Sequence, residues 1–182
     1  MPTGELITRG TIWLALMAGA AGAGINLVAS SNFKPERIAR WAWTVGGIAY
    51  LGHIASAFHF YHHWSHGAAY QETARQTAAM VGLNWGGGIY FNYVFTLAWL
   101  AVVAWWWCDP QWHACRSRLL SRCWHSLFLF MVFNGAVVFG HGPVRWLGLV
   151  LCLGLGGLWW IHGRRKRDVK TPRPTRSGQN HL

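Results

Sequence analysis

The sequence predicts an all-α integral membrane protein: a bundle of about five transmembrane helices, with the N-terminus outside and the C-terminus in the cytoplasm. Hydrophobic residues make up 53% of the 182 residues, and charged residues only 12%, against roughly 25% in a soluble domain. The basic residues gather in short clusters between long apolar runs. This pattern is typical of membrane proteins and argues against a partner among nucleic acids, despite the formal net charge of +11.

Five apolar runs divide the chain into candidate membrane spans. Each is close to the ~20 residues that a helix needs to cross a hydrocarbon core of ~30 Å. The runs cover approximately residues 10–30, 41–61, 85–107, 124–141 and 143–162. Residues 1–162 therefore form the predicted bundle, and residues 163–182 are predicted to be a basic, disordered cytoplasmic tail.

The distribution of lysine and arginine orients this bundle. With five spans and a cytoplasmic C-terminus, 13 of the 16 basic residues face inward, in the first link, the third link and the tail. Only Arg9, Arg75 and Arg145 face outward. Because cytoplasmic segments of membrane proteins carry an excess of basic residues, the split favours this orientation in a bacterial-type inner membrane or a plasma membrane.

The first apolar run has two interpretations. Residues 18–24 are all alanine or glycine, and such small residues let two helices approach closely. We therefore expect the first helix to pack against a neighbour. The alternative is a cleaved signal peptide, which would place Lys34, Arg37 and Arg40 outside, against the charge distribution.

The tryptophans are predicted to anchor the helices at the two membrane boundaries, as aromatic belts do. Those expected at the inner boundary are Trp41, Trp43, Trp105, Trp106, Trp107, Trp124, Trp159 and Trp160, and those at the outer boundary are Trp64, Trp85 and Trp146.

The longest link, residues 62–84, lies on the predicted outer side. Residues 68–81 contain good helix formers and neither proline nor glycine, which predicts a short helix at the outer surface. Three glycines follow at 86–88, and they indicate either a flexible or a closely packed turn before the third span.

The segment His53–His66 is the most distinctive stretch, because four histidines occur near its end at helical spacing. His59, His62, His63 and His66 stand at i, i+3, i+4 and i+7, so on a continuous helix they would share one face. Imidazole together with carboxylate suits a transition metal such as iron, copper or zinc.

A single metal ion cannot use all four histidines, because His59 and His66 would lie about 10.5 Å apart along a helix axis. Further ligands would have to come from other parts of the outer side. The predicted ligand set is His59, His62, His63, His66, His141 and Glu72. The alternative to a metal site is an interfacial histidine cluster that is hydrogen-bonded to water and lipid headgroups.

Two polar residues are predicted to lie within the membrane, His53 and Asn134. An ionisable side chain at that depth is costly and is expected to face the bundle interior, where Asn134 could satisfy His53. A b-type haem is the other interpretation. Its axial ligands would be His59 and His141, or His53 and a partner.

The pieces His59-x-x-His62-His63 and His62-His63-x-x-His66 resemble the histidine boxes of membrane di-iron desaturases and hydroxylases. The resemblance covers eight of 182 residues. Those families use several boxes on the cytoplasmic face, whereas this sequence has one, on the predicted outer side. No catalytic residue is carried over from the resemblance.

Two function classes follow from the sequence, and whether the protein is an enzyme stays open. The first is a membrane oxidoreductase with a metal or haem site at the outer surface. The second is a non-enzymatic membrane scaffold or assembly subunit, with other membrane subunits or a second copy as partners. In either class the bilayer is a partner. The tail residues predicted to contact anionic lipid are Arg164, Arg165, Lys166 and Arg167.

Overall fold

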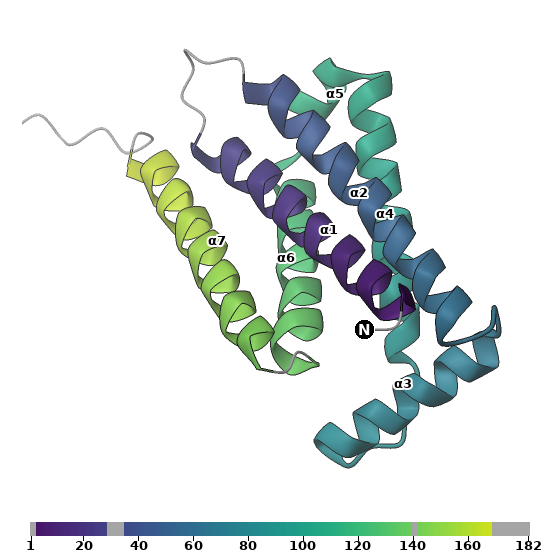
Figure 1. Cartoon of the computed structure of the whole chain (residues 1–182). Coiled ribbons are helices and arrows are strands. Elements are labelled where there is room, and N and C mark those ends of the chain that lie inside the picture. The colour runs from purple at the N-terminus through teal and green to yellow at the C-terminus, as the bar shows by residue number, and fades with distance from the viewer. Residues whose placement is uncertain (1–2, 29–34, 140–141, 169–182) are drawn as a thin grey trace, which may run out of the picture.

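The computed structural model describes residues 3–28, 35–139 and 142–168, and within these ranges the chain forms helices and no strand (Figure 1). The all-α prediction is therefore confirmed. The elements are α1 (Thr3–Val28), α2 (Pro35–Phe60), α3 (His66–Val81), α4 (Gly88–Cys108), α5 (Pro110–Ala114), α6 (Arg118–Val132), the π-helical η1 (Phe133–Val138) and α7 (Pro143–Asp168).

Most of the described part of each predicted apolar run lies on its own helix: α1, α2, α4, α6 with η1, and α7. The ends differ from the prediction. The first helix begins at Thr3, the fourth at Arg118, and the last continues to Asp168. The backbone of the first six residues of the predicted tail, 163–168, is thus helical, and the rest of the tail lies outside the described residues. The polar residues at these helix ends explain why the apolar runs alone underestimate the helices.

Two of the described helices are long and apolar enough to cross a membrane, over Thr3–Asn26 in α1 and Gly88–Cys108 in α4. A third apolar stretch, Arg145–Ile161 in α7, is shorter. By length and composition, membrane association therefore has support from two helices. Among the described residues this test identifies two candidate spans, whereas the sequence predicts five.

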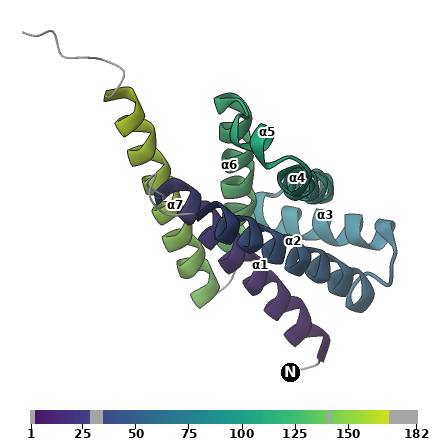
Figure 2. The ribbon, with the colours of Figure 1, turned by 90° about the horizontal axis from the view of Figure 1, so that it is seen from above.

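The long helices run between two ends of the molecule (Figures 1 and 2). α1 and α2 lie side by side and make the most extensive helix pair, and α4 contacts α2. The beginning of α2, the short helix α5 and the end of α7 lie toward the upper end in Figure 1, while α3 crosses the lower end. We call these the α5 end and the α3 end. The α5 end corresponds to the predicted inner side and the α3 end to the predicted outer side.

Small residues bring α1 and α2 into close contact, as predicted for residues 18–24. A Cβ atom on Gly46 would lie 3.2 Å from the backbone nitrogen of Gly19 and 3.3 Å from the carbonyl oxygen of Ala15. A Cβ on Gly22 would lie 2.9 Å from the Trp43 ring. The small residues therefore serve helix packing, since no larger side chain fits between these backbones.

An aromatic core fills the space between α2, α4 and α6. The Trp43 ring lies 5.0 Å from Phe128 and 5.4 Å from Trp99, and the Trp99 indole N–H donates to the carbonyl oxygen of Trp43 at 3.0 Å. Trp43, Trp106 and Trp124 are buried, so the prediction that they anchor at the boundary is wrong for these three. Gly22 leaves room for the Trp43 ring, Trp106 stacks on His113, and Trp124 packs among Trp43, Phe95 and Trp99.

The glycines before α4 form a closely packed turn, which decides between the two predicted alternatives. A Cβ on Gly86 would collide with the carbonyl oxygen of Tyr70, and one on Gly88 would lie 3.1 Å from the Thr73 side chain. The predicted surface helix is confirmed as α3, from His66 to Val81. The turn therefore presses the beginning of α4 against α3.

Candidate functional site

The histidine segment does not form one continuous helix. α2 ends at Phe60, and the chain turns through His63 and Trp64, whose φ angles of 48° and 59° are left-handed. The Trp64 amide donates to the carbonyl oxygen of Phe58 at 3.0 Å, which closes the turn. Ser65 then caps α3, its hydroxyl accepting the Ala68 amide at 3.2 Å. The prediction that the four histidines share one helix face is wrong for this reason.

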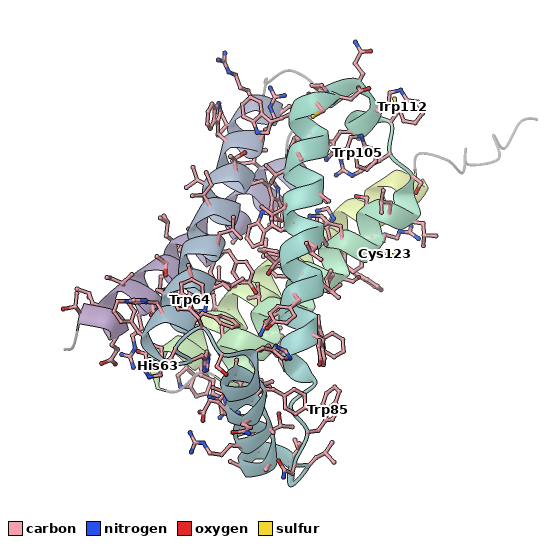
Figure 3. The ribbon with its side chains drawn as sticks, turned by 90° about the vertical axis from the view of Figure 1, so that its right-hand side faces the viewer. His63, Trp64, Trp85, Trp105, Trp112 and Cys123 are labelled. Atoms are coloured by element: carbon pink, nitrogen blue, oxygen red, sulfur yellow. The ribbon has the colours of Figure 1, made fainter. Side chains whose placement is uncertain are left out.

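The four histidines instead lie in three elements and contact different groups. The His59 ring packs on Phe60, with centroids 4.7 Å apart, and the His62 ring packs on Phe58 at 5.6 Å. His63 lies in the turn beside Trp64 (Figure 3). His66 opens α3, and its Nδ1 lies 2.9 Å from the Tyr93 hydroxyl of α4. The turn therefore separates side chains that the spacing had placed together.

Tyrosines surround His66 where α3 meets the beginning of α4. The His66 ring lies 5.8 Å from both Tyr90 and Tyr93 and 6.5 Å from Tyr70. These contacts give His66 a structural role, because its hydrogen bond to Tyr93 ties α3 to α4. The sequence did not indicate this, since the three tyrosines follow four to 27 residues later in the chain.

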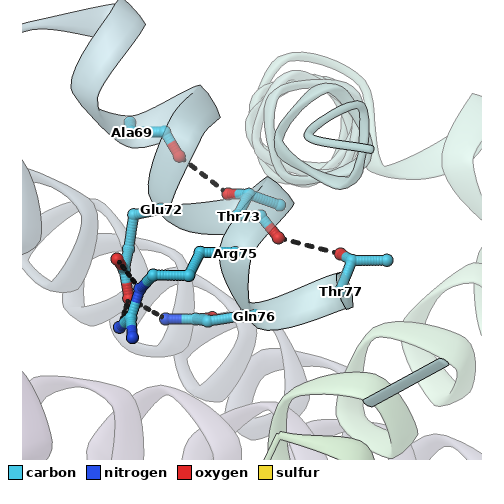
Figure 4. A network of polar contacts seen from close by, with 6 residues as sticks. All are labelled: Ala69, Glu72, Thr73, Arg75, Gln76 and Thr77. Atoms are coloured by element: carbon cyan, nitrogen blue, oxygen red, sulfur yellow. Dashed lines mark hydrogen bonds and ion pairs between the residues drawn. The ribbon is translucent and has the colours of Figure 1, made fainter. Parts of the chain in front are cut away.

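Glu72 lies on α3, and side chains of the same helix donate hydrogen bonds to its carboxylate. Arg75 donates to it through Nε at 2.8 Å and Nη2 at 2.6 Å, and the Gln76 amide donates at 2.8 Å (Figure 4). The Arg75 and Gln76 hydrogen bonds lower the pKa of Glu72 to about 2. A metal ion would have to displace these donors to use Glu72.

A cleft of about 680 Å³ lies between the turn and α3. Two of the predicted ligands, His62 and Glu72, line it. Its lining residues are Tyr61, His62, Ala68, Gln71, Glu72, Arg75 and Gln76. Two possible metal ligands are fewer than the three or four protein ligands of a typical zinc site. Within the described ranges, no three His, Cys, Asp or Glu residues come together as a metal site would require.

The remaining predicted residues divide between described and undescribed parts of the chain. His141 lies outside the described residues, so the structure does not place the predicted His59–His141 haem pair. The backbone of Arg164–Arg167 belongs to α7, and the side chains of these residues are not among those described.

His53 and Asn134 do not satisfy one another, contrary to expectation. Nδ1 of His53 lies 2.9 Å from the carbonyl oxygen of Thr8 on α1, and its ring stacks on Tyr50 at 6.2 Å. Asn134 donates to the carbonyl oxygen of Phe130 in its own helix. The Thr8 carbonyl oxygen also accepts from the Thr11 hydroxyl at 3.1 Å, and it comes within reach of His53 because α1 and α2 pack together, which the sequence could not show.

A second polar cluster lies at the α5 end and was not predicted as a site. The His113 ring is buried, stacks on Trp106 at 4.3 Å and lies 5.9 Å from Trp105. Nη1 of Arg116 lies 2.9 Å from Nε2 of His113. Burial first, and then the charges of Arg116 and Arg40, lower the pKa of His113 to about 4, so this imidazole is neutral at pH 7.

The sequence matches no protein-family model, and comparisons with curated proteins and with solved structures find no match either.

The turn at His63 gives a direct test of the histidine segment. Left-handed backbone costs a non-glycine residue roughly 1 kcal/mol, so His63→Gly should raise the free energy of unfolding by up to about 1 kcal/mol. His59→Gly is the matched control, because it puts glycine into a helical turn and should lower stability by a similar amount. Unfolding in detergent and bound metal per protein are measured together. If His63 ligates a metal, His63→Gly would lower the bound metal instead.

Proposed function

We propose that this chain is a multi-pass membrane protein with five spans, N-terminus outside and C-terminus in the cytoplasm, that works as a non-enzymatic scaffold or assembly subunit. The observation that carries the proposal is the apolar outer surface of the long helices. Leu14, Ile48, Leu97 and Leu153 are exposed by 53%, 65%, 68% and 73%, on α1, α2, α4 and α7. Water-soluble monomers rarely expose such extensive apolar surface, whereas a bilayer solvates it.

The placement of charge supports the orientation. The clusters that begin α2 and α6 belong to the same end as α5 and the end of α7 (Figure 1). Arg37, Arg40, Arg116 and Arg122 therefore share one end, as the predicted topology requires. In this proposal Arg164–Arg167 contact anionic lipid there, each basic residue near the surface contributing about 1 kcal/mol.

Three glycines of α7 that have no close neighbour among the described residues support an assembly role. A Cβ on Gly154, Gly156 or Gly157 would meet nothing within 4 Å, whereas Gly148 on the same helix packs against Ala136. Glycine weakens a helix interior unless a close neighbour uses the space. In membranes that neighbour is typically another transmembrane helix, here one from a partner or a second copy.

The separation of the histidines supports the proposal that the protein is not an enzyme. His59 packs on Phe60, His62 packs on Phe58, and His66 contacts Tyr93. Metal analysis and an absorption spectrum of protein purified without chelator test this proposal. Stoichiometric iron, copper or zinc, or a haem Soret band, would contradict the scaffold and favour the membrane oxidoreductase.

Cysteine labelling in intact cells tests the five spans. Serine first replaces the four native cysteines, which are all free thiols. Single cysteines are then introduced by Arg37→Cys, Gln71→Cys and Gly178→Cys and treated with a membrane-impermeant maleimide. Five spans predict labelling at 71 only, until the cells are permeabilised.

The pattern of labelling separates this topology from its competitors. If only α1 and α4 span with the N-terminus outside, position 178 labels and position 71 is protected. If only these two span with the N-terminus inside, positions 37 and 71 both label. Either result would contradict the proposal.

A further inference from the structure

Two arginines at the α5 end carry charge that no carboxylate neutralises among the described residues. The ion pairs within the described ranges are Arg9 with Glu5, at the beginning of α1, and Arg75 with Glu72, on α3, and neither lies at the α5 end. Arg40 of α2 and Arg116, between α5 and α6, are each partly buried and have no such partner within the described ranges. A partly buried cation is costly unless hydrogen bonds or an anion compensate it.

Arg40 is held against α4, and it makes one side-chain hydrogen bond among the described residues. Its Nη1 donates to the carbonyl oxygen of Trp106 at 3.2 Å, and its Cζ lies 4.4 Å from the centroid of the Trp107 ring. Its Nε is buried and has no hydrogen-bond partner among the described residues. These contacts fix the position of the guanidinium but use only one of its five N–H groups.

Arg116 lies beside His113. Its Nη1 donates to the His113 carbonyl oxygen at 3.0 Å and contacts the imidazole. Burial lowers the pKa of Arg116, and both arginines lower the pKa of His113. The two arginines are connected through one stacked pair, because Arg40 donates to the carbonyl oxygen of Trp106, whose ring stacks 4.3 Å from the His113 ring that Arg116 contacts.

The nearest acidic side chains in sequence are engaged or exposed. The Asp109 carboxylate accepts the Trp112 amide at 2.9 Å and so caps α5. Glu36 is exposed on the first turn of α2. Trp105 and Trp112 mark this end in Figure 3, and the Trp105 ring lies 5.9 Å from the His113 ring.

We propose that Arg40 and Arg116 together bind a phosphate group at the α5 end. Guanidinium forks match the geometry of phosphate oxygens and form charge-assisted hydrogen bonds with them. A phosphate would supply acceptors for the unused N–H groups and the negative charge that the described part of the protein does not provide. The Trp106 carbonyl oxygen holds Arg40, and the His113 ring stacked on Trp106 holds Arg116, so both guanidiniums are positioned by the same stacked pair.

The phosphate has two sources, an anionic lipid headgroup or a soluble phosphate compound. The lipid source rests on the proposed function, because it needs the α5 end to lie at the inner membrane boundary. The soluble source does not. The experiment therefore uses one probe for each.

Detergent-purified protein is titrated with phosphatidylglycerol by native mass spectrometry and, separately, dialysed against radiolabelled inorganic phosphate. Arg40→Gln and Arg116→Gln should each weaken binding of at least one probe about tenfold or more. Arg37→Gln and Arg122→Gln are the matched controls, exposed arginines of the same end, and should change it less than twofold.

Arg40→Lys and Arg116→Lys are the controls for folding and charge, because lysine keeps the positive charge but lacks the forked guanidinium. Each should recover the fold and only part of the affinity. Loss of lipid alone identifies a headgroup, and loss of inorganic phosphate identifies a soluble ligand. Equal losses in the control variants, or unchanged binding in both glutamine variants, would overturn the site. Neither result bears on the labelling pattern that tests the five spans.

Discussion

Trp99→Ala should lower the free energy of unfolding by about 3–5 kcal/mol, the range for deleting a large buried aromatic side chain. Trp99 is 3% exposed and lies at the centre of the aromatic core. Its ring centroid lies between 5.2 and 6.3 Å from those of five other side chains. These neighbours are Trp43, Tyr50, Phe95, Trp124 and Phe128. The substitution removes contacts to α2, α4 and α6 together, and it also removes the hydrogen bond to Trp43.

The measurement is reversible unfolding in mixed detergent, with Trp112→Ala as the control. Trp112 is 72% exposed, so its removal should change stability by less than about 0.5 kcal/mol. Trp99→Phe keeps most of the ring contacts and loses the hydrogen bond, so it should fall between the two. If Trp99→Ala proved as mild as Trp112→Ala, the aromatic core would not hold the bundle together.

Gly46→Val should destabilise the bundle by about 3 kcal/mol or more, because overpacking against backbone cannot be relieved by a rotamer change. A Cβ at residue 46 would lie 2.9 Å from the Trp99 ring, besides its close approach to the α1 backbone at Ala15 and Gly19. The helices α1 and α2 would have to separate to admit the side chain.

Gly52→Val is the matched control on the same helix. A Cβ there would meet only the Thr11 methyl group at 3.6 Å, an ordinary contact. Both variants replace a helical glycine by the same residue, so their difference in unfolding free energy isolates the packing effect. Equal effects at the two positions would show that α1 and α2 do not approach as closely as described.

The sequence was sufficient to predict the helices and one packing surface. Apolar runs of about 20 residues need a helix to satisfy their backbone groups, so each run became one long helix. The small residues 18–24 were predicted to pack closely, and Gly19 and Gly22 do. Both inferences depend on local properties, length and side-chain size, which a single segment carries by itself.

The candidate site was not predictable in the same way. The four histidines have helical spacing, but the chain leaves the helix at Phe60 through a left-handed turn made by His63 and Trp64. Such turns usually contain glycine or asparagine, so the local residues gave no sign of it. The arginine–histidine cluster was missed for a different reason. Arg40 and Arg116 are 76 positions apart, and they come to the same cluster only because α2 and α5 both pack against α4.

Trp41 and Trp43 show the division between sequence and tertiary structure most clearly. Both stand at the beginning of the same apolar run, and the sequence by itself determined that the run is helical. Trp41 is 51% exposed and stays at the surface, whereas Trp43 is 2% exposed beside Gly22 and Phe128. Two positions along a helix differ by about 200° in direction, so they face opposite ways. Which of the two faces meets a neighbour depends on where α1, α4 and α6 pack, and only the tertiary structure decides that.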